Sequence, residues 1–166
     1  NGIAVFKKEN KQLELIQQYG EQNGLFFPDV RFIKKDKQQN IWLGTWGGGV
    51  MQFNPYNKRF ESNYRINSYM SQLNITALEV DKTNNLWVGT SDGLVYYEIN
   101  KGLVDRLTQV NGLAGNEISC LFVDNNNVVW VGSREKGLSK IIGNQISIVE
   151  LEKQLLTINS MAQDKE

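Results

Sequence analysis

The chain has 166 residues, and its 18 lysines and arginines balance its 18 aspartates and glutamates, so its formal net charge is zero. A nucleic-acid-binding domain usually carries a basic excess, so we expect no nucleic-acid partner. Histidine is absent, which removes the commonest general base, the commonest metal ligand and the usual activator of a serine or cysteine nucleophile. We therefore expect a protein that is not an enzyme and that has no cofactor and no metal ion.

The same inspection gives no sign of a membrane span, a signal peptide or a disulfide scaffold. No apolar run approaches the roughly 20 residues that span a bilayer, so we expect no membrane contact by this segment. The first residues, "NGIAVFKKEN", lack the apolar region of a signal peptide. The single cysteine, Cys120, cannot form an internal disulfide, which excludes a disulfide-stabilised scaffold.

In chain order, residues 2–22 begin with "GIAVF", a glycine followed by apolar residues, which predicts the end of a repeat that recurs three times downstream. Residues 23–66 contain four predicted strands, "VRFIKKD", "NIWLGT", "GVMQF" and "KRFESNY". The same order returns in residues 67–110 and in residues 111–152, with turns rich in glycine, asparagine and aspartate. Residues 153–166 contain "INSMAQD", which fits the first strand of a further repeat.

The repeat is defined by a tryptophan in its second strand and an aspartate six residues earlier. The equivalent of Trp42 is Trp87, which follows after 45 residues, and the next equivalent is Trp130, which follows after a further 43 residues. The full set is Trp42, Trp87 and Trp130, with Asp36, Asp81 and Asp124. Four antiparallel strands in a repeat of about 40–45 residues are typical of a propeller blade. The predicted fold is therefore all-β, a β-propeller fragment of about four blades, each a four-stranded antiparallel sheet.

The repeated residues have a structural interpretation. A large aromatic ring at one position of successive blades fills the wedge between neighbours, so we expect the three tryptophans to be buried. We expect Ile75, Leu78, Ile118 and Leu121 to be buried with them. The aspartates are predicted to form Asx turns. Calcium binding by the aspartates is the lesser alternative, because no second acidic residue recurs beside them.

The candidate binding surface is the face that we call the loop face. It carries the turns between second and third strands and the loops between blades, because successive connections of an up-and-down sheet alternate ends. The loops differ in sequence while the opposite turns are nearly uniform, as expected of a binding face. The candidate ligand-binding residues on it are Trp46, Phe27, Arg31, Tyr69, Asp92, Arg134 and Glu135.

Trp46 is the most informative of these candidates because it has no counterpart in the other repeats. Its turn reads "TWGGG", whereas the equivalent turns read "TSDG" and "SREKG". Aromatic rings beside polar groups suit a sugar, which has an apolar face and a rim of hydroxyls. The structural alternative is that Trp46 covers a neighbouring loop. Phe26 and Phe27 have a similar alternative, because either can cover a blade edge.

The stretch "NGLAGNEISCLFVDNNNVVWVGSREKGL" at 111–138 resembles the two-component regulator propeller repeat, and weaker copies lie at 23–50 and 71–94. This resemblance implies the periplasmic sensor region of a hybrid two-component system histidine kinase. Such regions respond to oligosaccharides, and the remainder of the same sensor protein would be a partner. The resemblance identifies blades and does not assign ligand-binding residues.

The sequence leaves alternatives for both the assembly and the function. A seven-bladed ring at about 44 residues per blade needs roughly 300 residues. Either the chain is an excised fragment, or two copies self-associate through blade edges. The alternative function is a propeller scaffold for protein–protein interaction or dimerisation without a small-molecule ligand. Streptogramin lyases are enzymes of similar fold, but they use a histidine, which this chain lacks.

Overall fold

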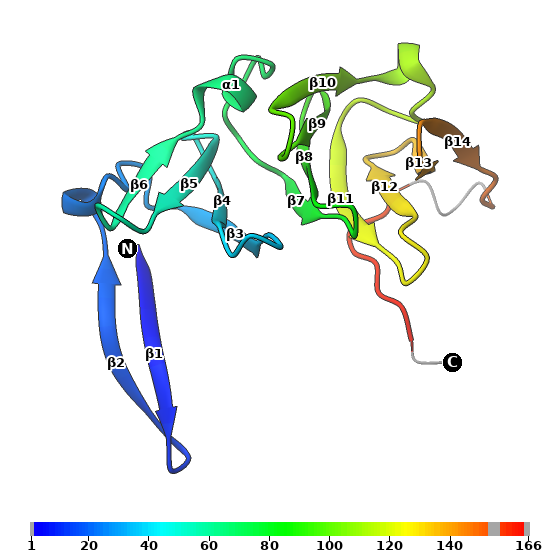
Figure 1. Ribbon diagram of the computed structural model, residues 1–166. Coiled ribbons are helices and arrows are strands. Elements are labelled where there is room, and N and C mark those ends of the chain that lie inside the picture. The colour runs from blue at the N-terminus through cyan, green and yellow to red at the C-terminus, as the bar shows by residue number, and fades with distance from the viewer. Residues whose placement is uncertain (1, 153–156, 165–166) are drawn as a thin grey trace.

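The computed structural model describes residues 2–152 and 157–164 and is built almost entirely of antiparallel strands. Three four-stranded sheets stand side by side, and a two-stranded hairpin precedes them (Figure 1). Within the described residues the longest helix, α1 (Tyr64–Asn67), has four residues. The all-β propeller-fragment prediction is therefore confirmed.

Each sheet is one blade with its strands in sequence order. Blade 1 contains β3 (Val30–Lys35), β4 (Ile41–Thr45), β5 (Val50–Asn54) and β6 (Arg59–Ser62). Blade 2 contains β7 (Ala77–Val80), β8 (Asn85–Thr90), β9 (Gly93–Glu98) and β10 (Leu103–Leu107). Blade 3 contains β11 (Ile118–Val123), β12 (Val129–Ser133), β13 (Gly137–Ile142) and β14 (Gln145–Val149). These strands lie inside the predicted repeats, whose boundaries stay predictions.

Short helical turns connect the blades. The 3-10 helices η1 (Glu21–Asn23) and η2 (Gln109–Asn111) precede blades 1 and 3, and each ends at a glycine in the left-handed region. The helix α1 occupies the loop between blades 1 and 2 and is capped by Asn63, whose side chain accepts the Ile66 backbone N–H. Sequence analysis did not predict α1, because four residues are too few to show a helical period.

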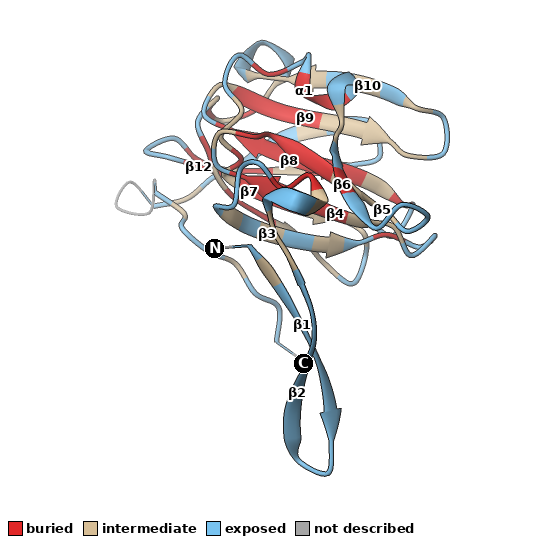
Figure 2. Ribbon diagram, turned by 90° about the vertical axis from the view of Figure 1, so that its left-hand side faces the viewer, coloured by how far each residue is buried: buried red, intermediate tan, exposed pale blue. Residues whose placement is uncertain are grey.

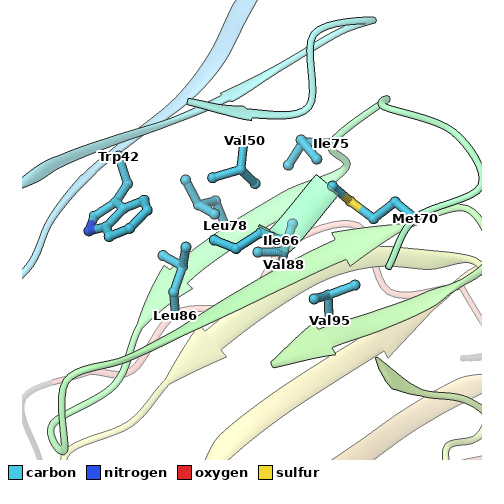
Figure 3. Close-up of a cluster of buried hydrophobic side chains, with 9 residues drawn as sticks. All are labelled: Trp42, Val50, Ile66, Met70, Ile75, Leu78, Leu86, Val88 and Val95. Atoms are coloured by element: carbon cyan, nitrogen blue, oxygen red, sulfur yellow. The ribbon is translucent and has the colours of Figure 1, made fainter. Parts of the chain in front are cut away.

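The core consists of clusters that fill the spaces between and within the blades. Figure 3 shows the cluster between blades 1 and 2, in which Trp42 lies among aliphatic side chains from both sheets and from α1. Trp42 and Trp87 are 1% and 5% exposed, as predicted. The four predicted aliphatic core residues, Ile75, Leu78, Ile118 and Leu121, are also buried.

Trp130 differs from the expectation because it is only partly buried. Its indole lines an open hollow together with Phe122 and residues 161–164, and no complete blade packs against that side in the described chain. Burial of the repeated tryptophan therefore depends on the following blade, which covers Trp42 and Trp87.

Successive blades are joined by the same two contacts. The glycine two residues after each tryptophan leaves room for an isoleucine of the next blade: a Cβ on Gly44 would lie 2.8 Å from Ile75. Gly89 receives Ile118 in the same way, and Gly132 receives Ile158. Side chains also accept backbone N–H groups across the blade boundary, at Lys37–Asn84, Lys82–Asn127 and Asn125–Gln163.

The two ends of the described chain contain incomplete blades. The hairpin of β1 (Ile3–Glu9) and β2 (Gln12–Tyr19) projects from the body and is almost wholly exposed (Figure 2). Among the described residues β1 pairs only with β2. Residues 157–164, expected to include a first strand, are in no strand although Ile158 occupies the position of Ile75 and Ile118.

Candidate functional site

The loop face forms as predicted, because each turn between second and third strands bonds to a loop between blades. The Trp46 backbone N–H donates to the Asp29 carbonyl at 2.9 Å, and the Arg134 N–H donates to the Glu117 carbonyl at 2.9 Å. In blade 2 the Ser71 hydroxyl donates to the Asp92 carboxylate. These turns and loops therefore share one end of the three sheets.

Trp46 lies on this face and not in the core between blades. Its side chain is 45% exposed, whereas the side chain of Trp42 is 1% exposed. The backbone is nonetheless fixed, because Trp46 forms an isolated antiparallel bridge with Asn74 of the following loop. The ring is thus presented to solvent on a well-anchored turn.

Arg31 lies beside this ring. Its guanidinium carbon is 4.5 Å from the Trp46 ring centroid, which is a cation–π arrangement. The same guanidinium makes an ion pair with Asp29 at 3.1 Å, and both side chains are about half exposed. The ion pair with Asp29 holds the guanidinium over the indole and leaves it accessible to solvent.

Phe27 completes this cluster, which we call the aromatic patch: Phe27, Arg31 and Trp46. Phe27 is 46% exposed, and its ring covers Gly48, where a Cβ would lie 2.6 Å from ring carbons. The three glycines after Trp46 are required for different reasons. Gly47 and Gly49 have φ of +92° and +70°, whereas Gly48 is needed for the close approach of Phe27 and not for positive φ.

The remaining candidates are distributed along the face and not gathered around Trp46. Tyr69, 42% exposed, follows α1. Asp92 bonds to Ser71 and Thr90 and makes a 3.0 Å ion pair with Arg106. Burial raises the pKa of Asp92, but the bonds from Ser71 and Thr90 and the charge of Arg106 outweigh it and lower the pKa below the usual value. Asp92 is thus charged and already partnered.

Blade 3 supplies the last two candidates. Arg134 makes a 2.9 Å ion pair with Glu117, and both side chains are largely exposed. Glu135 has φ of +55°, so it serves the turn, and its backbone N–H donates to the Thr157 hydroxyl at 3.2 Å. No contact joins these residues to the aromatic patch in the part of the chain that the structure describes.

Sequence analysis missed the partners that orient the candidates. Asp29 and Glu117 hold the two arginines, and Arg106 holds Asp92. The Arg106 Nε atom is buried and has no hydrogen-bond partner among the described residues. Asp29 could have been suspected only from its closeness to Arg31 in the sequence, because it lies just before β3 and outside the alternation of a strand.

The repeated aspartates have a role that goes beyond the predicted Asx turn. Asp36 accepts the Trp42 indole N–H at 2.9 Å, and Asp81 accepts that of Trp87 at 2.8 Å. Asp124 accepts the Trp130 indole N–H at 2.9 Å. The other carboxylate oxygen accepts turn backbone N–H groups, for example from Asn40. Within the described residues no group of three histidine, cysteine or acidic side chains is arranged to hold a metal ion.

The comparisons with known proteins agree with this architecture. Residues 69–92 and 112–135 match the sequence profile of the family described as "Two component regulator propeller". These two segments are two-component regulator propeller repeats. Each match runs from a loop between blades, through the first and second strands, to the turn after the tryptophan strand.

Solved structures share the propeller fold. The extracellular domain of the hybrid two component system BT4673 from B. thetaiotaomicron is 19% identical, with a TM-score of 0.75 over 95% of this chain and 21% of that one. That of BT3049 from the same organism is 21% identical, with a TM-score of 0.63 over 82% of this chain and 21% of that one. The chain thus spans about a fifth of their length.

One curated relative matches in sequence. The chloroplast photosystem II stability/assembly factor HCF136 of Guillardia theta is 33% identical over 112 residues, which is 61% of this chain and 27% of that protein. Among the helices of the described residues, none has the length and apolar character required to cross a membrane.

Proposed function

We propose that these propeller repeats belong to the extracytoplasmic sensor region of a hybrid two-component regulator and that the loop face binds an oligosaccharide. The observation that carries the proposal is the aromatic patch, in which a non-repeated tryptophan is 45% exposed with a guanidinium 4.5 Å from its ring. The family match and the shared fold of two-component extracellular domains support the sensory role.

The chemistry of the patch suits a sugar ring. Trp46 offers a flat apolar surface for the face of the ring, and Arg31 offers N–H donors for hydroxyl or carboxylate groups at its edge. A stacking tryptophan is rigid and accessible, which limits the entropy lost on binding. We therefore expect a carbohydrate with one exposed apolar ring face, and an acidic sugar gains an additional partner in Arg31.

The test is the Trp46→Ala variant, measured for unfolding and for binding to a panel of neutral and acidic disaccharides by calorimetry. We expect the free energy of unfolding to change by less than about 1 kcal/mol, because the side chain is largely outside the core. Binding should weaken by about 1 kcal/mol, as for one lost stacking surface. Trp87→Ala is the matched control, with an expected stability loss of about 3–5 kcal/mol as a buried aromatic.

Two results would contradict the sugar-binding proposal. If Trp46→Ala destabilises the chain as strongly as Trp87→Ala, the ring serves packing and the sugar-binding proposal is wrong. If stability is retained and the disaccharides that bind the parent chain bind the variant equally well, the aromatic patch is not the ligand site.

A second function, docking to another protein surface, is favoured by the hairpin. Phe6, Leu13 and Leu15 are 52%, 69% and 48% exposed, and Phe6 pairs with Leu15 across the two strands. Alternation along β2 places Leu13 and Leu15 on one face. An apolar sheet face whose β1 edge is unpaired among the described residues suits self-association through blade edges.

A further inference from the structure

A groove of about 470 Å³ opens between blades 2 and 3, and it contains none of the loop-face candidates. Its apolar lining includes Trp87, Tyr96 and Ile141. A second hollow shares these three residues and extends the groove as far as Asp81. The volume lies within the range of small-molecule sites, which is about 300–1,000 Å³.

One position of the repeat carries a smaller residue at this groove than at the preceding blade boundary. Between blades 1 and 2, Tyr97 of β9 packs edge-on against Trp42, with ring centroids 5.9 Å apart. Tyr97 is the fourth residue after Gly93, and the fourth residue after Gly137 on β13 is Ile141. An isoleucine is shorter than a tyrosine, so no ring from blade 3 covers Trp87 as Tyr97 covers Trp42, and Trp87 and Ile141, 5% and 2% exposed, form the floor of the groove.

The walls of this groove are acidic and aromatic. Glu98 and Asp105 line it, and no lysine or arginine is among its lining residues. Glu98 makes a 2.8 Å ion pair with Lys101, which is itself two-thirds exposed, and the Asp105 carboxylate accepts only the adjacent Arg106 backbone N–H. Asp105 thus brings to the rim a carboxylate that faces no cation in the described chain.

The pKa of Tyr96 reflects the same negative environment. Its ring lies 4.5 Å from that of Trp87, and the pair forms the aromatic wall. Burial and then the charges of Glu98 and Asp81 raise the pKa of Tyr96 to about 12. The phenol therefore stays neutral at physiological pH and keeps its O–H as a donor.

We propose that this groove binds a small organic cation with an apolar body, such as an arylalkylammonium ion. The apolar body would lie against Ile141 and the aromatic wall, and the ammonium group would lie near Asp105 and Glu98. Aromatic faces attract cations, and desolvation in a groove strengthens that attraction. An anion of the same shape would meet the carboxylates of Glu98 and Asp105 and no lysine or arginine among the lining residues, so charge favours the cation.

The experiment titrates the full chain with 2-phenylethylammonium while the four indole N–H signals are followed by NMR. We expect selective movement of the Trp87 signal, because its ring lines the groove, and no comparable movement with 3-phenylpropionate. The Ile141→Tyr variant should abolish binding by restoring the ring that fills the equivalent space beside Trp42. Ile142→Tyr is the matched control, since Ile142 is 53% exposed and outside the groove, and it should bind normally.

A third variant separates charge from shape. Asp105→Asn should weaken binding about threefold, the size expected for one solvent-screened charge pair. Equal binding of 3-phenylpropionate, undiminished binding by Ile141→Tyr, or no movement of the Trp87 signal at millimolar ligand each overturns the proposal. If Ile141→Tyr does not fold, Asp105→Asn and the comparison of the two ligands decide the outcome alone.

Discussion

Replacing Asp81 by alanine removes the acceptor that fixes a buried tryptophan. Asp81 accepts the Trp87 indole N–H at 2.8 Å, the Asn85 backbone N–H at 2.9 Å and the Thr83 backbone N–H at 2.8 Å. Trp87 is only 5% exposed, and although a hollow reaches Asp81, water would replace the acceptor for the indole less readily here than at the partly buried Trp130. A buried donor left without a partner costs about 1–3 kcal/mol. We expect Asp81→Ala to lower the free energy of unfolding by about 2–4 kcal/mol.

Asp124→Ala is the control because it removes the same indole and backbone bonds at a site of different burial, while Asp81 alone also accepts side-chain bonds from Thr83 and Asn85. Asp124 accepts the Trp130 indole N–H at 2.9 Å and the Val128 backbone N–H at 2.9 Å. Trp130 lines an open hollow, so water can take the place of the carboxylate. We expect a loss of about 1 kcal/mol, which is typical of a side chain that caps turn N–H groups.

Urea unfolding followed by far-ultraviolet circular dichroism measures both variants against the parent chain. Equal slopes of free energy against urea would show that the difference arises from stability and not from the extent of unfolding. We expect the two losses in free energy of unfolding to differ. If they agree within about 0.5 kcal/mol, the neighbouring blade does not determine how much the aspartate–tryptophan bond stabilises the fold.

The same bond gives a pH dependence with a definite sign. Burial raises the pKa of Asp81, but the Asn85 backbone N–H, the Trp87 indole and the Thr83 side chain together lower it below the usual value. The carboxylate therefore stabilises the fold above its unfolded pKa of about 3.9, and this stabilisation is lost as the pH falls through the lower folded value. The parent chain should lose more stability below about pH 4 than Asp81→Ala does, as measured by urea midpoints.

Three further outcomes are expected. Gly89→Ala should cost about 1–3 kcal/mol in calorimetric unfolding, because the added methyl would lie 2.8 Å from Ile118; an unchanged melting temperature contradicts this. Gly48→Ala should displace the exposed Phe27 ring and leave stability within about 0.5 kcal/mol while disaccharide affinity falls; a large stability loss would show that the ring is immovable. Light scattering should show association that Leu13→Lys abolishes, and a monomeric parent chain would remove the self-association proposal.

The blade architecture could be predicted from the sequence because the repeat imposes the same residue types on equivalent strands. Trp42, Trp87 and Trp130 establish the period, and the glycine after each establishes where the next blade approaches. The indole–carboxylate bond could not be derived, since a six-residue separation across a turn becomes a contact only once the turn conformation is known. The turns achieve it with φ of +69° at Gln39 and Asn84 and +63° at Asn127.

The candidate site was less predictable than the fold. The exposure of Trp46 followed from its failure to recur, but its guanidinium neighbour, Arg31, lies where the register of β3 shifts, which the sequence does not show. The partial burial of Trp130 depends on a neighbouring blade and not on its own repeat. The pairing of Asp92 with Arg106 joins residues 14 positions apart, and no motif indicated it.

The glycine two residues after each tryptophan makes neighbouring blades interdependent. A side chain at Gly44 would meet Ile75, and one at Gly89 would meet Ile118, both of which belong to the following blade. Each repeat therefore constrains its neighbour as well as its own strands. A substitution at one of these glycines should act on two blades at once, whereas a substitution in an exposed turn should act on one blade alone.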